Sequence, residues 1–292
     1  MKILVTGAEG QLGSEIRSIA EQYPDFNFLF TDINELDLTD HQALESFVKK
    51  SSPDYIINCA AYTAVDIAEE DVELAKLLNT KVPGQLGTLA TQYNCKVIHV
   101  STDYVFDGTA YLPYTENDLV NPESVYGKTK LNGEIALLKE STSAMVIRTS
   151  WLYSGYGKNF VKTMIKLGEE RDELKVVFDQ VGTPTYAGDL ARAILTIILK
   201  TSRNELEWKP GIYHYTNEGV CSWYDFAKAI HEISGIQCNV HPIISEEYPT
   251  PAKRPPYSVL NKSKIKRIFE LEIPYWRDSL NKCINELKNK NE

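Results

Sequence analysis

The stretch that decides the fold is "TGAEGQLG", residues 6–13. It places Gly7, Gly10 and Gly13 in a GxxGxxG spacing, after the apolar run 2–6 and before a helix-like segment at 11–23. Glycine lets the backbone turn here, approach a pyrophosphate and pack the helix on the strand, while the helix N-terminus favours the anion. The order predicts the first strand–helix unit of a dinucleotide-binding domain. Its expected cofactor contacts are Gly7, Gly10, Gln11, Leu12 and Gly13.

Short apolar runs recur along the first half of the chain. They cover residues 27–32, 54–59, 96–101 and 144–149, and helix-like segments, among them 40–50 and 67–92, separate them. Strands that are apolar on both faces and alternate with helices are typical of a parallel sheet covered on both sides. We therefore expect a doubly wound α/β domain of the Rossmann kind.

Past about residue 150 the pattern changes. Aromatic residues, prolines and glycines crowd into 150–160, 179–189 and 246–258, which reads as loops. A strand is expected at 211–216, and amphipathic helices at 222–234 and 275–289. We expect residues 1–152 with about 175–216 to form the NAD(P)-binding domain. The rest, about 153–174 with 217–292, is expected to form a smaller α/β domain for the substrate.

Composition narrows the class of protein. The net charge of −9 argues against a nucleic-acid partner, which needs clustered lysine and arginine. No apolar run of about 18 residues occurs, and glycine comes too early for a signal peptide, so we expect a cytoplasmic protein without a membrane partner. The five cysteines show no CxxC spacing and the five histidines no metal motif, which predicts reduced thiols and no zinc site.

Asp32 lies 19 residues after Gly13, at the end of the second apolar run, where a carboxylate can bind the adenosine ribose. A turn or cap role explains Asp32 as well. No arginine or lysine follows closely, so NADH should bind at least as readily as NADPH. Asp37 is placed near the adenine, although Thr39 or Asp40 as a helix cap explains the same letters. The further expected cofactor contacts are Leu38, Ala60, Ala61, Tyr62 and Thr63.

The segment "VYGKTKLNGE", residues 125–134, has three interpretations. A phosphate-binding P-loop fails, because Pro122 stands where that motif needs glycine. A plain helix has a core-facing stripe of Leu131, Ile135 and Leu138, with Lys130 and Glu134 as a solvated ion pair.

The third interpretation is catalytic. Tyr126 and Lys130 share one helix face, and the hydroxyl-bearing "STDYVFDG" at 101–108 ends a strand on the expected ligand side. A neighbouring ammonium favours the charged form of a phenol and prepares it for proton transfer.

These motifs together resemble the extended short-chain dehydrogenase/reductase superfamily. Within it the chain is similar to the dTDP-4-dehydrorhamnose reductase family along nearly its whole length. The motifs that carry the resemblance are "CAAYTAVD", "STDYVFDG", "YGKTKLNGE", "RTSWLY", "NFVKTM", "DQVGTPT" and "PTPAKRP".

The resemblance implies reduction of the C4 ketone of a dTDP-4-dehydro sugar by NADPH or NADH. Tyr126 is then the proton donor, Lys130 holds the nicotinamide ribose, Thr102 replaces the usual serine, and Ser101 is structural. The implied substrate contacts are Thr102, Asp103, Trp151, Asn159 and, for the pyrophosphate, Arg254.

Several of these roles have competitors. Trp151 could be a core tryptophan, Asp103 a turn cap, and Lys253 a solvated charge beside Arg254. Other nucleotide-sugar reductases, epimerases and dehydratases share the superfamily, but a dehydratase usually has Asp and Glu after the threonine, and here Tyr104 follows Asp103. A non-catalytic alternative resembles the regulatory subunit of methionine adenosyltransferase.

Assembly is expected to be monomeric or homodimeric. Some members of the family dimerise through Mg²⁺ held by acidic residues, and the matching positions are Glu15, Asp189 and Glu286. The dipole of the first helix explains Glu15 without a metal, and Asp189 is shorter than the expected glutamate. We expect catalysis without a metal and any dimer through this patch to be weak or metal-sensitive.

Overall fold

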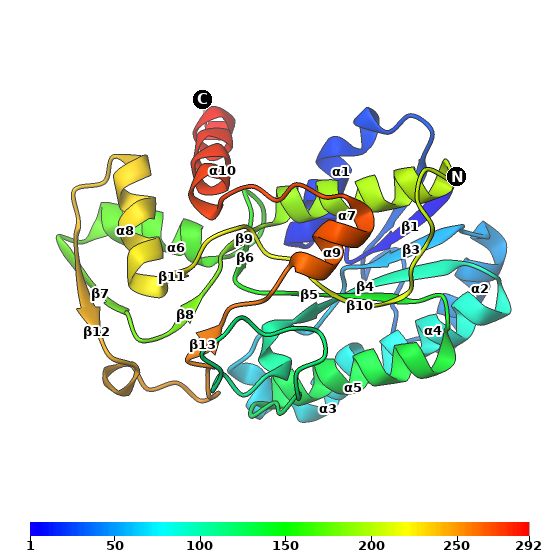
Figure 1. Cartoon of the computed structure of the whole chain (residues 1–292), viewed down its shortest axis with the longest axis horizontal. Coiled ribbons are helices and arrows are strands. Elements are labelled where there is room, and N and C mark those ends of the chain that lie inside the picture. Colours follow the sequence, from blue (N-terminus) through cyan, green and yellow to red (C-terminus); the bar gives the residue numbers. More distant parts are fainter. Residues whose placement is uncertain (292) are drawn as a thin grey trace.

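A parallel sheet forms the centre of the N-terminal part of the computed structural model, which describes residues 1–291 and their side chains as far as residue 289 (Figure 1). Its strands run in the order β10-β5-β4-β3-β1-β2, and each neighbouring pair is parallel. The chain passes from β1 outward to β2 and then returns to the other side of β1. In such a sheet ligands bind at this reversal, beyond the carboxyl ends of the strands. The strands are β1 (Lys2–Thr6), β2 (Asn27–Thr31), β3 (Tyr55–Asn58), β4 (Lys96–Thr102), β5 (Met145–Thr149) and β10 (Gly211–His214).

Helices cover both faces of this sheet, because side chains alternate along each strand. Ile3 and Val5 face the cluster that includes α1 (Gln11–Ile19) and α7 (Ala187–Ser202), whereas Leu4 faces the opposite cluster. Figure 1 shows α1 and α7 on one side of the sheet and α2, α4 and α5 on the other. The predicted doubly wound α/β fold is confirmed. The second layer consists of α2 (His41–Ser51), α4 (Val82–Gln92) and α5 (Val125–Glu140).

The segment expected to be helical at 67–92 forms a continuous helix only from residue 72, and a π-helical turn, η3 (Leu77–Lys81), replaces the α-helical hydrogen bonding just before α4. Asn79 in this turn is fully buried, and its amide bonds the backbone of Tyr62 and the hydroxyl of Thr129 on α5. The turn therefore locks α5 against the loop that follows β3. The remaining short elements here are η1 (Ala20–Gln22), η2 (Ile67–Glu69), α3 (Val72–Lys76), η4 (Asp103–Val105) and α9 (Ser263–Phe269).

A second hydrophobic core lies beyond the sheet. Phe226 and Ile230 of α8 (Trp223–Ser234) pack there with Leu280 of α10 (Trp276–Asn291) and Val161 of α6 (Phe160–Glu170). Small sheets pair β12 with β7, β6 with β9, and β8 with both β11 and β13. Their strands are β6 (Leu152–Tyr153), β7 (Glu173–Val177), β8 (Val181–Gly182), β9 (Thr185–Tyr186), β11 (Cys221–Ser222), β12 (Asn239–Ile243) and β13 (Tyr257–Ser258), and the short 3-10 helix η5 (Ser245–Glu247) follows β12.

The two cores qualify the expected domain boundaries. Strand β7 pairs in parallel with β12, and its Leu174 and Val176 belong to the second core. Residues 175–177 therefore pack with the smaller part of the chain, and the return to the large sheet comes at α7. The sequence did not predict this pairing, because β7 is a short strand between loops and no local pattern indicates that β12 is its partner.

Helix α5 also differs from its expected amphipathic pattern. Ile135 is 57% exposed, whereas Lys130 and Glu134 are each only 1% exposed. The interpretation of these two charges as a solvated ion pair is wrong. The buried face of α5 is polar because partners on β4 and β5 satisfy it.

Among residues 1–291, none of the helices combines the length and the apolar character that a membrane span requires.

Candidate active site

A cavity of about 910 Å³ opens at the carboxyl ends of the central strands. The glycine loop forms one wall, the ends of β3 to β5 form the floor, and Trp151 and Trp223 reach in from the second core. The position agrees with the ligand site expected at the reversal of a doubly wound sheet. The predicted site residues that line it are Gly7, Gly10, Gln11, Leu12, Asp32, Leu38, Ala60, Ala61, Thr63, Thr102, Asp103, Tyr126, Lys130, Trp151 and Asn159.

The glycine loop fits a bound dinucleotide. Gly7 has φ +66°, and a Cβ atom on it would lie 2.7 Å from the backbone nitrogen of Ala60. Helix α1 begins at Gln11 without a side-chain cap, so its first N–H groups are available to an anion. Gly13 does not line the cavity; it lets α1 pack on the backbone of Gly7 and Ala8.

Asp32 holds the shape of the adjoining turn. Its carboxylate accepts hydrogen bonds from the backbone N–H groups of Glu9, at 2.8 Å, and Ile33, at 2.8 Å. Asp32 also lines the cavity, so the turn role is present and the ribose contact stays a prediction. Asp37 lies outside the cavity lining and bonds Thr39, while Asp40 caps α2.

Tyr126 and Thr102 meet at the floor of the cavity. Ser124 caps α5 and so places Tyr126 in its first turn, where the ring of Tyr104 packs edge-on at 5.4 Å. Burial raises the pKa of Tyr126 to about 12, against a hydrogen bond with Thr102 that lowers it. Tyr126 is therefore a protonated phenol at neutral pH. The Thr102 hydroxyl caps η4 and donates to Asp103 at 3.0 Å.

Asp103 is buried beside this pair. Burial raises its pKa to about 6, although hydrogen bonds with Ser258 and Thr102 oppose the shift. The expected cap role belongs to Thr102, not to Asp103.

Lys130 lies one turn further along α5 and turns toward the sheet. Its Nζ donates to the carbonyl of Val100 at 2.7 Å and lies 3.3 Å from Nε2 of His99. Burial lowers its pKa to about 8, against the charge of Glu134. The ammonium therefore titrates close to neutral pH.

Ser101 lines the cavity and is also hydrogen-bonded into the packing of α5, so its structural role stays a prediction. Its hydroxyl donates to Glu134 at 2.5 Å, and Glu134 also forms a buried ion pair with Arg148 of β5 at 2.7 Å. These contacts tie α5 to β4 and β5.

Trp151 follows β5 with φ +49°, which is an unusual backbone conformation for a large side chain. Its ring stacks on Trp223 with centroids 3.6 Å apart, and a Cβ atom on Gly182 would lie 2.8 Å from it. Both tryptophans line the cavity. Strained residues of this kind cluster at ligand sites, which favours the wall interpretation of Trp151.

Arg254 lies outside the cavity lining and forms a two-bond ion pair with Asp66, at 2.7 Å and 3.1 Å. This hydrogen-bonded pair lowers the pKa of Asp66. Lys253 is a surface charge paired with Glu123. The phosphate role of Arg254 stays a prediction, and it requires the guanidinium to leave or share Asp66.

Asn159 caps α6 and donates from its amide to Gln11 at 3.0 Å. It thus links the glycine loop to the second core. Tyr62 is not among the residues that line the cavity, and its hydroxyl donates to Asp71 at 3.4 Å.

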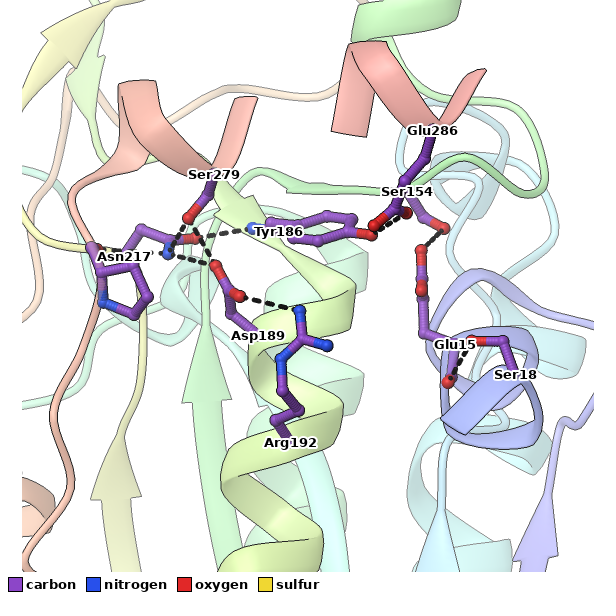
Figure 2. Close-up of polar contacts among 10 residues, drawn as sticks. Glu15, Ser18, Ser154, Tyr186, Asp189, Arg192, Asn217, Ser279 and Glu286 are labelled. Atoms are coloured by element: carbon purple, nitrogen blue, oxygen red, sulfur yellow. Dashed lines mark hydrogen bonds and ion pairs between the residues drawn. The ribbon is translucent and has the colours of Figure 1, made fainter. Parts of the chain in front are cut away.

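The acidic residues of the expected metal patch fall into two groups (Figure 2). Glu15 accepts from Ser154 at 2.6 Å, and Glu286 accepts from the hydroxyl of Tyr186 at 2.6 Å. Asp189, beyond the Tyr186 ring, is engaged by three other residues. Those partners are Asn217, Ser279 and Arg192. Within residues 1–291, no group of three or more His, Cys, Asp or Glu side chains is arranged to hold a metal ion.

The sequence reasoning missed several residues of this site. Trp223 is 72 positions from Trp151, and no local signal connects them. Asn58 and His99 could have been noticed as polar residues inside otherwise apolar strands. All five cysteines are free, as expected, but Cys59 lines the cavity.

The fold and this site define a nucleotide-binding protein of the short-chain dehydrogenase/reductase class. A family model described as "RmlD substrate binding domain" matches residues 1–289. The chain is 42% identical to dTDP-4-dehydrorhamnose reductase of Aggregatibacter actinomycetemcomitans over 285 residues, which cover 96% of this chain and 97% of that protein. It belongs to the dTDP-4-dehydrorhamnose reductase family.

Solved structures of dTDP-4-dehydrorhamnose reductases are also similar to this chain. The crystal structure of a dTDP-4-dehydrorhamnose reductase from Clostridium acetobutylicum has a TM-score of 0.92 and 45% identity, covering 99% of this chain and 100% of that one. The enzyme from Bacillus anthracis in complex with NADP has a TM-score of 0.92 and 36% identity, covering 98% and 99%.

Proposed function

We propose that this protein reduces the C4 ketone of dTDP-4-dehydro-L-rhamnose to dTDP-L-rhamnose with NADPH or NADH, for the synthesis of cell-surface polysaccharide. The observation that carries the proposal is the position of Tyr126, Thr102 and Lys130 in one cavity with the glycine loop. A protein that only binds a dinucleotide has no need for these acid–base residues. The presence of all three residues together favours an enzyme over a regulatory subunit.

The residues divide the work between binding and proton transfer. Gly7, Gly10 and the N-terminus of α1 would hold the pyrophosphate of the cofactor, and Asp32 the adenosine ribose. The nicotinamide, when bound, supplies the hydride. Tyr126, protonated at neutral pH, donates its proton to the ketone oxygen as that oxygen gains charge.

The substrate is held between the two cores. Thr102 presents a hydroxyl beside Tyr126, and the Trp151–Trp223 stack gives an apolar wall against which a deoxysugar can lie. Arg254 is proposed to reach the pyrophosphate of the sugar nucleotide, because a guanidinium can bind phosphate with two parallel bonds.

The test uses purified protein with a dTDP-4-dehydro-6-deoxy sugar, the matching epimerase and NADPH or NADH. We expect loss of the absorbance of the reduced cofactor and formation of one molecule of dTDP-L-rhamnose for each cofactor oxidised. Cofactor binding without turnover over hours would contradict the proposal and favour a binding role.

The assembly and place of action are also proposals. We infer a cytoplasmic monomer or homodimer that needs no metal for turnover. Activity and molar mass by light scattering, each measured with and without EDTA, separate the possibilities. Turnover that stops on chelation would refute the metal-independent mechanism.

A further inference from the structure

A buried row of hydrogen-bonding side chains joins three strands to Lys130. Thr6 Oγ1 donates to Asn58 Oδ1 at 2.8 Å, Asn58 Nδ2 lies 2.9 Å from His99 Nδ1, and His99 Nε2 lies 3.3 Å from Lys130 Nζ. All four side chains are at most 1% exposed. Every donor and acceptor in the row must therefore find its partner within the protein.

Ala60 decides which way the Asn58 amide faces. The backbone N–H of Ala60 donates to Asn58 Oδ1 at 3.2 Å, and a backbone N–H has no acceptor capacity. Turning the amide over would bring its NH₂ group against this N–H. Asn58 therefore presents Nδ2, a donor, to the ring of His99.

The orientation of the Asn58 amide fixes the tautomer of the His99 ring. Because Nδ1 faces a donor, it must accept, and a neutral imidazole then carries its single hydrogen on Nε2. Burial lowers the pKa of His99 well below its usual value, so the ring is neutral. The N–H at Nε2 points at Lys130.

Lys130 completes the row as an acceptor. An ammonium has three donors and no acceptor, whereas a neutral amine has a lone pair that can receive the His99 N–H. The Val100 carbonyl accepts from Lys130 in either state. We propose that Asn58 and His99 are positioning residues that hold Lys130 as a neutral amine in the ligand-free protein at pH 8.

Other charged and titratable groups lie near Lys130, and none of them reverses its preference for the neutral state. Glu134, one turn along α5, favours the ammonium, but its carboxylate is bound by Arg148. Asp103 and Tyr126 lie on the cavity side. Burial lowers the pKa of Lys130 to about 8, and the donor facing Nζ adds a further cost to the ammonium.

The arrangement has a consequence that rests on the proposed function. With Lys130 neutral, no ammonium favours the charged form of Tyr126, which reverses the expectation drawn from the sequence, and the phenol keeps the proton that it must donate. The charge state of Lys130 can be measured without substrate or turnover. Failure of this inference is thus distinguishable from failure of the proposed activity.

Nitrogen NMR on the ligand-free protein tests the proposal. With ¹⁵N-labelled histidine, we expect His99 to carry its hydrogen on Nε2. With ¹⁵N-labelled lysine, the signal lost in Lys130→Met should titrate with a midpoint below pH 8, compared with 10.5 for an ordinary lysine. A hydrogen on Nδ1 of His99, or a midpoint near the ordinary value, would overturn the proposal.

Asn58→Asp is the decisive variant, because it keeps the shape and turns the donor that faces His99 into an acceptor. The ring hydrogen should move to Nδ1, and the Lys130 midpoint should rise by more than one unit, a tenfold gain in proton affinity. The ring readout separates this switch from the effect of the added charge. An unchanged ring tautomer would contradict the argument.

Thr6→Val is the matched control. It removes one hydrogen bond to Asn58 but leaves the Ala60 N–H that sets the amide. The hydrogen of His99 should stay on Nε2. A switch in this variant would show that Ala60 does not decide the orientation and would refute the reasoning.

Discussion

Glu134→Gln tests whether the buried ion pair between Glu134 and Arg148 holds α5 in place. In the parent protein, Glu134 accepts from Arg148 at 2.7, 3.0 and 3.2 Å and from Ser101 at 2.5 Å. The side chains of the pair are 1% and 2% exposed, so the variant leaves a guanidinium buried without its counter-charge.

Breaking a buried pair from one side costs about 3–5 kcal/mol, because desolvation of the remaining charge is no longer offset. At roughly 2–4 °C for each kcal/mol in a domain of this size, the melting temperature should fall by about 6–20 °C. Urea unfolding followed by circular dichroism gives the free energy of unfolding directly.

Glu73→Gln is the matched control. It makes the same change in a surface pair, Glu73 with Lys76, whose side chains are 85% and 51% exposed. Exposed pairs contribute only about 0–1 kcal/mol, so this variant should be nearly as stable as the parent. Equal stability of the Glu134 and Glu73 variants would refute the structural importance assigned to the Arg148 pair.

Three further predictions concern ligand binding and pH. Asp32→Ala should weaken NADH more than NADPH in calorimetric titration, since the carboxylate can bond a free ribose 2′-hydroxyl but repels a 2′-phosphate; equal losses would leave only the turn role. Arg254→Lys should raise the KM for the nucleotide sugar without changing NADH affinity, because an ammonium cannot replace two parallel bonds, and an unchanged KM would remove Arg254 from the site. Asp103 has a pKa raised from 3.8 to about 6, so its stabilising contribution is complete below pH 3.8 and is lost as the pH rises through about 6. As the pH rises from 3.8 to 6, the free energy of unfolding of Asp103→Asn should therefore increase by about 3 kcal/mol relative to that of the parent. Urea unfolding at several pH values measures this difference. A difference that does not change with pH would contradict the raised pKa of the buried carboxyl.

The sequence predicted the central fold well, for a local reason. A strand, a glycine loop and a helix are contiguous in the chain, and strands buried on both faces show themselves as apolar runs. The same holds for Tyr126 and Lys130, because one helical turn fixes their spacing. Spacing along a helix or around a tight turn is a property of neighbours in sequence.

What the sequence could not give depends on pairs distant in the chain. The Trp151–Trp223 stack, the Asp66–Arg254 pair and the placement of β7 beside β12 are set by tertiary packing. The polar face of α5 misled the periodicity argument, because Glu134 looks like a solvent residue until Arg148 is brought against it.

Substrate turnover by Tyr126→Phe is the measurement that tests the central claim most directly. Oxidation of the reduced cofactor should be followed with the dTDP-4-dehydro sugar for this variant, the parent and the control variant Tyr93→Phe. Tyr93 follows the last residue of α4, and its hydroxyl donates to Glu45. Loss of the proton donor should lower kcat by roughly 10²–10⁴-fold while cofactor affinity and the control stay at parental values. A Phe variant that turns over at the parental rate would contradict the assignment of Tyr126 as the acid.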